Sequence, residues 1–584
     1  MRYLALACDY DGTLAHNGRV TPETLAALER LLASGRRLVM VTGRQLDELL
    51  GIFPEIGLFE WVVAENGGLL YRPSTKELRP LADSPKPEFV ARLAESGVSP
   101  VATGSTIVAT WEPHEQTVLE VIRSLGLELQ VIFNKGAVMV LPAGVNKASG
   151  LAAALEQMGL SRHNVVGVGD AENDHAFLEA CEFSAAVSNA LDSVKHSADY
   201  TTAGARGDGV AELIERMLAD DLAELSRSVR RHDLLLGAAA KQPLGVEPFG
   251  RTLLITGASG SGKSTAATAL LERLAEQGYQ FCILDPEGDY ETFEKAVVLG
   301  ASDRAPKVEE VLHALGRPSQ SVVVNLIGLS ISDRPTFFAE LAPRLLEMRV
   351  RTGRPHWIVL DETHHLAPVA WAPAERAVPA GMSETMLITV HPDQVAPPLL
   401  LSVSALVAVG AAAADSVRQF CQALGKRVPD LPIDRLEAGH VLYWRRGDSE
   451  PDVVALAPGR TERRRHSRKY AEGVLPPDRS FYFRGREGKL KLRAQNLLVF
   501  LQMAEGVDDD TWLYHLRRGD YSLWFADRIK DDELADEARQ VEAAEELGAV
   551  ESRELIKAAI ERRYTLPAAS PVPVPGADAE ARWN

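Results

Sequence analysis

The apolar run Thr252-Leu-Leu-Ile-Thr256 leads directly into Gly257-Ala-Ser-Gly-Ser-Gly-Lys-Ser-Thr265, near the middle of a 584-residue chain. The run predicts a buried strand, and the residues from Ala266 to Gln277 follow a helical pattern. In this order of strand, glycine-rich turn and helix, backbone N–H groups and the positive end of the helix dipole converge on a polyphosphate. The stretch therefore predicts a P-loop that binds a nucleoside triphosphate, which we expect to be ATP.

The residue types of this loop have separate expected roles. Lys263 would reach the terminal phosphates, and the Ser264 hydroxyl would bind Mg²⁺. The other predicted nucleotide-binding residues are Gly257, Ser259, Gly260, Ser261, Gly262 and Thr265.

A second apolar run, His356-Trp-Ile-Val-Leu-Asp361-Glu362, ends in two acids about a hundred residues further along the chain. ATP hydrolysis requires such a pair: Asp361 would hold Mg²⁺ and Glu362 would polarise the attacking water. The alternative is a solvated strand end. The strand after it, Leu387-Ile-Thr389-Val-His391, would bring Thr389 or His391 to the γ-phosphate.

The first 225 residues alternate short apolar strands with helical patterns, which predicts a parallel sheet covered by helices. Polar clusters follow the strands at the edge where α/β proteins place their sites. They are Asp9-Tyr-Asp11-Gly-Thr-Leu14, Thr42-Gly-Arg44, Lys147 at the start of a helix, and Gly169-Asp170-Ala-Glu-Asn173-Asp174.

These four clusters resemble the haloacid dehalogenase (HAD) superfamily of phosphatases. The resemblance implies Asp9 as the nucleophile that forms an aspartyl-phosphate and Asp11 as the acid/base. Thr42 would bind the transferring phosphoryl group, and Lys147 would neutralise its charge. Mg²⁺ would be held by Asp9, the Asp11 carbonyl and Asp170, with Asp174 supporting it. Residues 81–141 read as an inserted α/β cap, similar to the branch that acts on sugar phosphates.

The segments around the P-loop resemble the HerA/FtsK group of ATPases. The resemblance rests on the P-loop, Asp285-Pro-Glu-Gly-Asp-Tyr290, the Asp361-Glu362 strand and Glu437-Ala-Gly-His-Val-Leu-Tyr-Trp444. It implies a ring, commonly a hexamer, in which a neighbour's arginine completes the site. Arg349, Arg351 and Arg354 are the candidates for that arginine, and an exposed basic helix end is the alternative.

The whole chain divides into six expected segments, with an overall α/β fold class. They are the HAD-like phosphatase 1–225, a linker 226–250, the P-loop ATPase 251–458, a basic linker 459–479, a mainly helical domain 480–565 and a Pro-rich tail 566–584. The basic, aromatic stretch 480–493 would either contact nucleic acid or form a short ribbon with a solvated basic side. The helical domain would serve docking or assembly.

Bulk composition narrows the classes of function. The net charge of −18 argues against nonspecific attraction of the whole molecule to nucleic acid or anionic membranes. Four scattered cysteines indicate a reducing compartment and no disulfide framework. No apolar stretch is long enough to span a membrane, so we expect a cytoplasmic protein.

The sequence thus predicts a Mg²⁺-dependent phosphomonoesterase acting on a small phosphorylated metabolite, fused to an ATPase that regulates it or moves a partner. A polynucleotide kinase–phosphatase is the second hypothesis, although it predicts an uncapped phosphatase and an acid close to the P-loop. A DNA-associated translocase or defence ATPase with a phosphatase effector is the third, and the charge of −18 counts against it.

Overall fold

The structure is a computed structural model of the chain, and it falls into two compact units, Met1–Ala457 and Pro458–Asn584. The residues described are 1–134, 136–258, 260–369, 382–433, 435–460, 475, 480–485, 488, 490–529, 531–544 and 546–563. Within these residues no helix has the length and apolar character needed to cross a membrane. The four cysteines are free and buried.

The first 225 residues form an eight-stranded sheet with the order β12-β11-β10-β1-β2-β3-β4-β5. Its middle strands are parallel and fully buried, because helices cover both faces of such a sheet. The strands are β1 (Ala5–Cys8), β2 (Arg37–Val41), β3 (Trp61–Ala64), β4 (Leu69–Arg72), β5 (Glu77–Pro80), β10 (Val165–Gly169), β11 (Phe183–Ala186) and β12 (Tyr200–Thr201). The helices are α1 (Pro22–Ala33), α2 (Leu46–Ile52), α5 (Lys147–Met158), α6 (His175–Ala180), α7 (Asp192–Ser197), α8 (Arg206–Asp220) and α9 (Ala223–Ser226).

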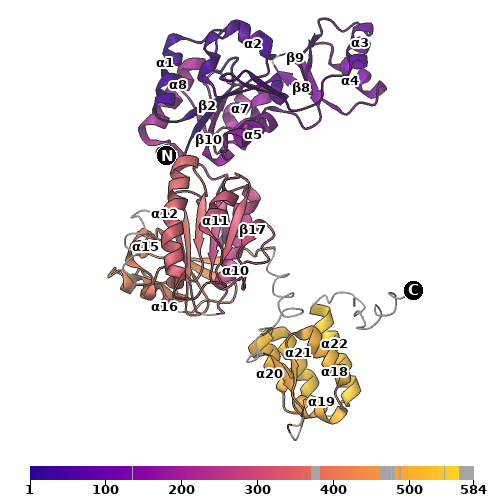
Figure 1. Ribbon diagram of the computed structural model, residues 1–584, viewed down its shortest axis with the longest axis vertical. Helices are drawn as coiled ribbons and strands as arrows, with labels where there is room; N and C mark the ends of the chain where they lie inside the picture. Colours follow the sequence, from indigo (N-terminus) through magenta and orange to yellow (C-terminus); the bar gives the residue numbers. More distant parts are fainter. Residues whose placement is uncertain are drawn as a thin grey trace, which may run out of the picture. The chain divides into compact units, whose positions relative to one another are not determined.

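A smaller module is inserted between β5 and α5 and carries its own sheet, in the order β6-β7-β9-β8. Figure 1 shows it as a separate layer beside the main sheet. Apolar residues of its two helices and its sheet form a core of their own, distinct from that of the main sheet. Its elements are α3 (Pro87–Glu95), β6 (Ala102–Thr103), β7 (Val108–Trp111), α4 (Glu115–Ser124), β8 (Leu129–Asn134) and β9 (Ala137–Pro142).

The turn Glu65-Asn66-Gly67-Gly68 after β3 joins the sheet to this module. The Glu65 carboxylate accepts hydrogen bonds from the backbone N–H groups of Ser105 (2.9 Å) and Thr106 (2.7 Å) in the module. Gly67 has φ of +106°, and a Cβ there would lie 1.9 Å from the Asn146 carbonyl oxygen. Only glycine therefore fits at this close approach to the start of α5.

The second sheet has eleven strands in the order β14-β13-β23-β22-β21-β15-β20-β19-β16-β18-β17. The strands from β21 to β17 are parallel, and the remaining four are antiparallel. The strands are β13 (Leu234–Ala239), β14 (Gln242–Val246), β15 (Thr252–Thr256), β16 (Phe281–Asp285), β17 (Ala296–Leu299), β18 (Ser321–Asn325), β19 (Trp357–Leu360), β20 (Thr385–Thr389), β21 (Ala405–Val409), β22 (His440–Arg445) and β23 (Asp452–Leu456). The helices are α10 (Lys263–Gln277), α11 (Val308–Leu315), α12 (Arg334–Thr352), α13 (Thr363–Leu366), α15 (Pro397–Ser402) and α16 (Ala413–Ala423).

The hairpin β13–β14 differs from the irregular linker expected over residues 226–250. Both strands belong to the second sheet, with β13 paired to β23. Pro243 lies in the edge strand β14, where no neighbour requires its missing N–H. The hairpin contains one proline and two glycines, which in the sequence favour a loop. It forms strands because β13 pairs with the distant strand β23.

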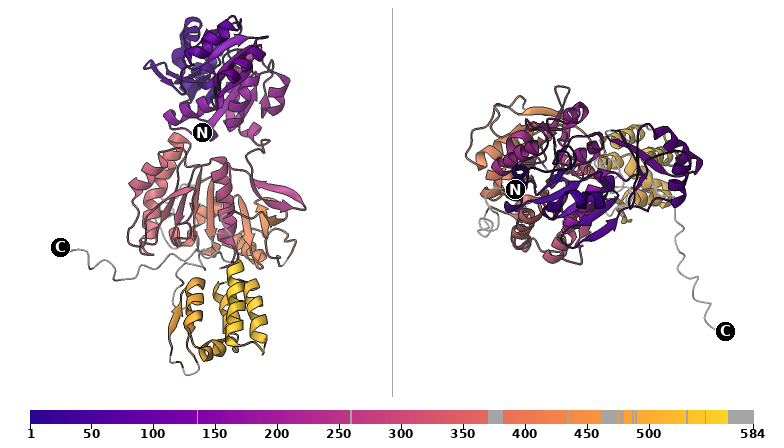
Figure 2. Two further views of the ribbon diagram at one scale, coloured as in Figure 1. Left: turned by 90° about the vertical axis from the view of Figure 1, so that its right-hand side faces the viewer. Right: turned by 90° about the horizontal axis from the view of Figure 1, so that it is seen from above.

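The second unit is mainly helical. A two-stranded ribbon of β24 (Phe481–Phe483) and β25 (Leu492–Ala494) precedes the helices. Trp512, Tyr521 and Phe525 are buried in its core, and α21 packs against α22. Figure 2 shows the helices of this unit in orange and yellow. The helices are α18 (Leu497–Gly506), α19 (Asp509–Leu516), α20 (Asp520–Trp524), α21 (Asp532–Ala543) and α22 (Ala549–Arg563), the last of which the sequence pattern did not predict. Most of the basic linker and the Pro-rich tail lie outside the described residues.

Two glycine-to-alanine changes in helices of the first sheet should have opposite effects. A Cβ at Gly150 in α5 would lie 2.4 Å from a Val63 methyl and 2.7 Å from the Gly67 Cα, so Gly150→Ala should cost about 1–3 kcal/mol. Gly51 in α2 has open space, and Gly51→Ala should gain about 0.5–1 kcal/mol of helix stability. Thermal unfolding of the two variants tests this, and equal midpoints would contradict the close approach at Gly150.

Candidate functional site

The carboxyl edge of the first sheet collects side chains from three strands and a helix. Asp9 follows β1, Thr42 follows β2 and Asp170 follows β10, while Lys147 is the first residue of α5. Parallel neighbouring strands end at one edge, so residues more than a hundred positions apart meet there. All four side chains are buried.

Lys147 holds two carboxylates of this site. Its Nζ donates to Asp9 Oδ1 at 2.6 Å and to Asp174 Oδ1 at 2.5 Å, and all three side chains are at most 5% exposed. Burial alone would lower the pKa of Lys147, but the charges of Asp174 and Asp9 raise it above its usual value. Lys147 is therefore a fixed positive charge at the bottom of the site.

Asp9, Asp170 and Asp174 place carboxylate oxygens within 4.8 Å of one another. Burial and the neighbouring charge of Asp174 raise the pKa of Asp9 to about 8. Three buried carboxylates face one ammonium, which leaves negative charge for a cation to balance. An all-oxygen donor set of this kind suits Mg²⁺, so the residues present fit that ion. Asp9 and Asp170 would bind it directly.

Asp174 has a second task, which is to shape the loop after β10. Its Oδ2 accepts hydrogen bonds from the backbone N–H groups of Asp170 (2.8 Å) and Ala171 (3.0 Å). Thr13 Oγ1 donates to Asp170 Oδ1 at 3.2 Å. With its other oxygen on Lys147, Asp174 orients Asp170 and is well placed to support a metal that Asp170 binds.

Asp11 is partly exposed, whereas Thr42 is buried, and both contact Arg44. Asp11 forms a two-pronged ion pair with Arg44, at 2.6 Å from Nε and 2.7 Å from Nη2. Thr42 Oγ1 accepts a hydrogen bond from the Arg44 backbone N–H at 3.2 Å. From the sequence alone, Arg44 belongs to a polar cluster but has no assigned role. Its ion pair with Asp11 joins residues 33 positions apart and becomes evident only in the folded structure.

Two further residues of the site had no role assigned from the sequence. Asn66 Oδ1 accepts from Asn173 Nδ2 at 3.0 Å, which links the turn after β3 to the loop after β10. Glu65 ties the same turn to the inserted module. Glu65 and Asn66 have positive φ, of 51° and 53° respectively. In the sequence, the one feature that could have pointed to these two residues is the Glu-Asn-Gly-Gly turn directly after a buried strand.

The glycine-rich loop after β15 forms the second candidate site. Gly257, Gly260 and Gly262 have φ of 156°, 75° and 99°, and a Cβ at Gly257 would lie 2.3 Å from the Val409 carbonyl oxygen. Lys263, the first residue of α10, donates to the Ala258 carbonyl at 3.1 Å across the loop. Ser261, Ser264 and Thr265 complete the described loop, whereas the predicted contact Ser259 lies outside the described residues.

The predicted acids lie near this loop. Burial, followed by the charges of Asp285 and Glu362, raises the pKa of Asp361 well above its usual value. Burial lowers the pKa of Lys263, while Glu362 and then Asp361 act in the opposite direction. These mutual influences place Lys263, Asp361 and Glu362 in one electrostatic neighbourhood. Ser264 Oγ lies 3.5 Å from Asp289 Oδ2 on the same side.

Strand β20 lies between β15 and β19 in the sheet and carries Thr389 at its end. His364 Nδ1 lies 3.0 Å from Thr389 Oγ1 and 3.4 Å from Glu362 Oε2. The His391 ring stands edge-on to His364 at 5.6 Å. Thr389 and His391 therefore contact His364, which lies beside the predicted catalytic glutamate. Glu362 has a left-handed backbone with φ of 39°.

Two of the three arginines that were candidates for completing a neighbouring subunit's site instead donate hydrogen bonds to backbone carbonyls of their own chain. Arg349 donates to the carbonyls of Pro355 and Ser383, each at 2.8 Å. Arg354 is 1% exposed and donates to the carbonyls of Leu315 and Gly159. The expectation is wrong for these two, because they close the end of α12 at the amino edge of the sheet. Arg351 alone is exposed.

Comparison with known proteins identifies the first domain. Residues 6–98 and 105–214 match the family described as haloacid dehalogenase-like hydrolase. A phosphoglycolate phosphatase of Methanothermobacter thermautotrophicus is 36% identical over 223 residues, which are 37% of this chain and 98% of that protein. The chain belongs to the haloacid dehalogenase-like hydrolases. A phosphoglycolate phosphatase of Halobacterium salinarum is 30% identical over 220 residues, or 36% of this chain and 96% of that protein.

The HAD-like part accounts for about the first third of the chain. A solved haloacid dehalogenase-like hydrolase from Bacteroides thetaiotaomicron is 22% identical, with a TM-score of 0.34, and covers 37% of this chain and 99% of its own. Residues 234–346 match a second family, described as the central domain of helicase HerA. The protein is a HAD phosphatase fused to a HerA-like domain, and the match to HerA begins at β13, in the stretch expected to be a linker.

Replacing the buried cation of the HAD site should abolish its function. Lys147→Met leaves Asp9 and Asp174 buried without a counter-charge, so phosphatase activity should fall at least about 10²-fold and stability by about 3–5 kcal/mol. Phosphomonoester hydrolysis and thermal unfolding measure both. Lys195→Met, which removes an exposed ion pair with Asp192, is the control and should change little. Full activity in Lys147→Met would show that the phosphoryl group does not depend on this cation.

Proposed function

We propose that residues 1–225 form a Mg²⁺-dependent phosphomonoesterase that works through an aspartyl-phosphate. The observation that carries this proposal is the convergence of Asp9, Asp170 and Asp174 on one buried point, with Lys147 bridging two of them. A phosphoryl group brings several negative oxygens, so its transfer depends on positioned positive charge.

The residues of the site divide the reaction between them. The Asp9 carboxylate attacks phosphorus, and Asp11 protonates the oxygen of the leaving alcohol. Asp11 then removes a proton from the water that hydrolyses the aspartyl-phosphate. Thr42 donates a hydrogen bond to the phosphoryl oxygens, and Lys147 balances their charge. When bound, Mg²⁺ supplies further charge compensation at Asp9, Asp170 and the Asp11 carbonyl.

The inserted module limits the substrate to a small phosphomonoester. Glu65 anchors it directly beside the site, where a lid excludes water and large substrates. The two relatives named phosphoglycolate phosphatases are aligned over nearly their whole length, which supports a small phosphorylated metabolite as the class. Phosphoglycolate and sugar phosphates are the substrates to test first.

Residues 251–458 bind and hydrolyse ATP in this proposal. The loop from Gly257 to Thr265 holds the phosphates, Ser264 and Asp361 hold Mg²⁺, and Glu362 activates water. The match to a helicase HerA domain supports the assignment and a ring of identical subunits, with a hexamer as the expected form. The ATPase then regulates the phosphatase or moves a partner relative to it.

A polynucleotide kinase–phosphatase is disfavoured by two features of the structure. The phosphatase carries a cap with its own sheet and core, which obstructs a polymeric substrate. In the second sheet, β20 separates β15 from the acidic strand β19, and it brings Thr389 between the phosphate loop and Glu362.

Hydrolysis of a phosphomonoester panel tests the phosphatase. The wild type with Mg²⁺ should hydrolyse small substrates, phosphoglycolate among them, and removal of Mg²⁺ by chelation should stop it. Asp9→Asn keeps the shape of the side chain but removes the nucleophile, so the rate should fall by at least about 10³-fold. Full activity of Asp9→Asn on the best substrate would show that the nucleophile lies elsewhere.

ATP binding and ATP turnover should be separable in the second domain. Lys263→Ala should lose nucleotide binding, while Glu362→Gln should keep binding but hydrolyse ATP at least about 10²-fold more slowly, because it cannot polarise water. Lys295→Ala removes an exposed lysine of the same domain and is the control. Phosphatase rates with and without ATP, measured on the same variants, test coupling: an ATP response that survives Lys263→Ala would rule it out.

A further inference from the structure

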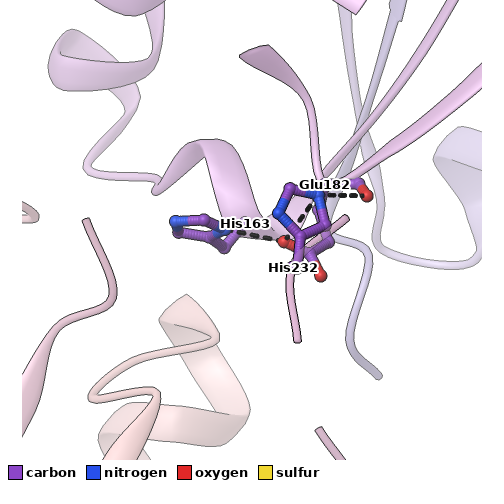
Figure 3. A group of neighbouring side chains, drawn as sticks. All are labelled: His163, Glu182 and His232. Carbon is purple, nitrogen blue, oxygen red and sulfur yellow. Dashed lines mark hydrogen bonds and ion pairs between the residues drawn. The ribbon is translucent and has the colours of Figure 1, made fainter. Parts of the chain in front are cut away.

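A cluster of His163, Glu182 and His232 lies apart from both phosphate sites (Figure 3). His163 lies in the short turn before β10, Glu182 directly before β11, and His232 two residues before β13. The three residues therefore gather at the amino ends of their strands, whereas the phosphatase residues follow the carboxyl ends. Neither the proposed phosphatase nor the proposed ATPase uses them.

Both histidine rings lie close to the Glu182 carboxylate. His163 Nδ1 lies 2.6 Å from Glu182 Oε2. His232 Nε2 lies 3.7 Å from the same oxygen and 3.1 Å from the backbone carbonyl oxygen of Glu182. One nitrogen of each ring and the carboxylate oxygen all fall within 4.8 Å of one another. Glu182 and His163 are 2% and 1% exposed, so the cluster is shielded from bulk water.

The hydrogen bonds of His163 require an extra positive charge at this point. Its Nε2 lies 2.9 Å from the Gln277 carbonyl oxygen, which only accepts, so Nε2 must carry a proton. A neutral imidazole then presents a lone pair at Nδ1, directly towards the Glu182 carboxylate. Two lone pairs at 2.6 Å repel, so a cation must lie between them. Either a second proton on His163 or a metal ion would satisfy the geometry.

The surroundings resemble those of a metal site more than those of a single ion pair. The Gln277 carbonyl fixes the ring so that Nδ1 faces the cluster, as the second partner of a metal-bound histidine commonly does. Tyr279 Oη donates to Glu182 Oε2 at 3.0 Å, and Arg2 binds the other oxygen. The Tyr279 ring also stacks on His163 with centroids 3.7 Å apart. Carboxylate and imidazole are thus both held in place by neighbours.

We propose that His163 Nδ1, Glu182 Oε2 and His232 Nε2 bind a zinc-type divalent cation, with water as the fourth ligand. Two histidines and one glutamate are a known zinc donor set. Bonds of about 2.0–2.1 Å in a tetrahedron need ligand atoms roughly 3.3 Å apart. The spacings of 2.6 Å and 3.7 Å to Glu182 Oε2 must therefore change by less than about 1 Å, and the spacing between the two ring nitrogens, which is at most 4.8 Å, by no more than about 1.5 Å. His232 would become the third ligand when its ring proton lies on Nδ1, so that Nε2 gives up its contact with the Glu182 carbonyl oxygen and offers its lone pair to the cation.

The site would join separate parts of the chain. His163 and Glu182 belong to the HAD sheet, His232 to the connection that follows it, and Gln277 and Tyr279 to the end of α10 and the turn after it. The cation would therefore have a structural role, holding the start of the HerA-like sheet against the HAD sheet. This role does not depend on either proposed activity.

Cobalt substitution of the full chain tests the site. The protein is treated with a chelator, supplied with excess Mg²⁺ to occupy the oxygen-only sites, and titrated with Co²⁺. We expect one equivalent to give the strong visible absorption of tetrahedral nitrogen-ligated cobalt, and one equivalent of Zn²⁺ to abolish it. His163→Gln and His232→Gln should each lose this absorption, whereas His114→Gln, which changes a partly exposed histidine of the cap, should keep it.

Two results would overturn the proposal. One is the absence of a stoichiometric tetrahedral signal from the wild type, which would assign the charge between His163 and Glu182 to a proton. The other is a signal that survives in His232→Gln. His232 is the most exposed of the three ligands, at 15%, so this variant should fold even if His163→Gln does not. Zinc should also raise the unfolding midpoint of the wild type and leave that of His232→Gln unchanged.

Discussion

Parallel strands end at a common edge, and both phosphate sites of this protein depend on that constraint. In the first sheet β1 lies between β10 and β2, so Asp9 stands beside Asp170 although 161 positions separate them in sequence. In the second sheet the ends of β15, β20, β19 and β16 bring together residues between Thr256 and Thr389. Neither site exists in any local segment, and each forms only when its sheet has assembled.

The same edge also brings carboxylates of like charge close together. Their mutual repulsion affects the protonation and the cation binding of both sites. Asp9 and Asp174 are buried within reach of one lysine, and burial shifts the pKa of Asp9 in the direction of a neutral acid. Asp361 shows the same behaviour beside Asp285 and Glu362. A buried carboxylate group that has too few positive partners favours the binding of a cation. The proposed Mg²⁺ at each site would therefore stabilise the fold locally as well as take part in chemistry.

Much of this arrangement could be predicted from the sequence, because it depends on local signals that recur in order. An apolar strand followed by Asp-x-Asp, or by a glycine-rich turn and Lys-Ser-Thr, is legible without a structure. The two sheets and the mainly helical end follow from the same patterns. The family matches agree with the predicted HAD phosphatase and HerA-like parts.

The features that sequence reasoning missed are those decided by distant partners. The strand β13 looks like part of a linker until β23, more than two hundred residues later, supplies its hydrogen bonds. Arg349 and Arg354 have the composition of an exposed basic helix end, yet backbone carbonyls of their own chain occupy them. Glu65 reads as an ordinary acidic turn residue, and only the fold shows that it anchors the cap.

The cluster at His163 bears on whether the two halves of the chain influence each other. Strand β10 begins two residues after His163 and ends directly before Asp170, while β16 begins two residues after Tyr279 and ends at Asp285. Contiguous strands thus connect this cluster with each phosphate site. A connection by strands does not by itself couple the two sites. Energetic coupling requires an element that has two alternative conformations, and both sites must shift the equilibrium between them. A metal ion that draws His163, Glu182 and His232 together would supply such an element, since its binding must change the spacing between His163 and Glu182. If the phosphatase and ATPase activities depend on each other, we therefore expect this cluster to mediate that dependence.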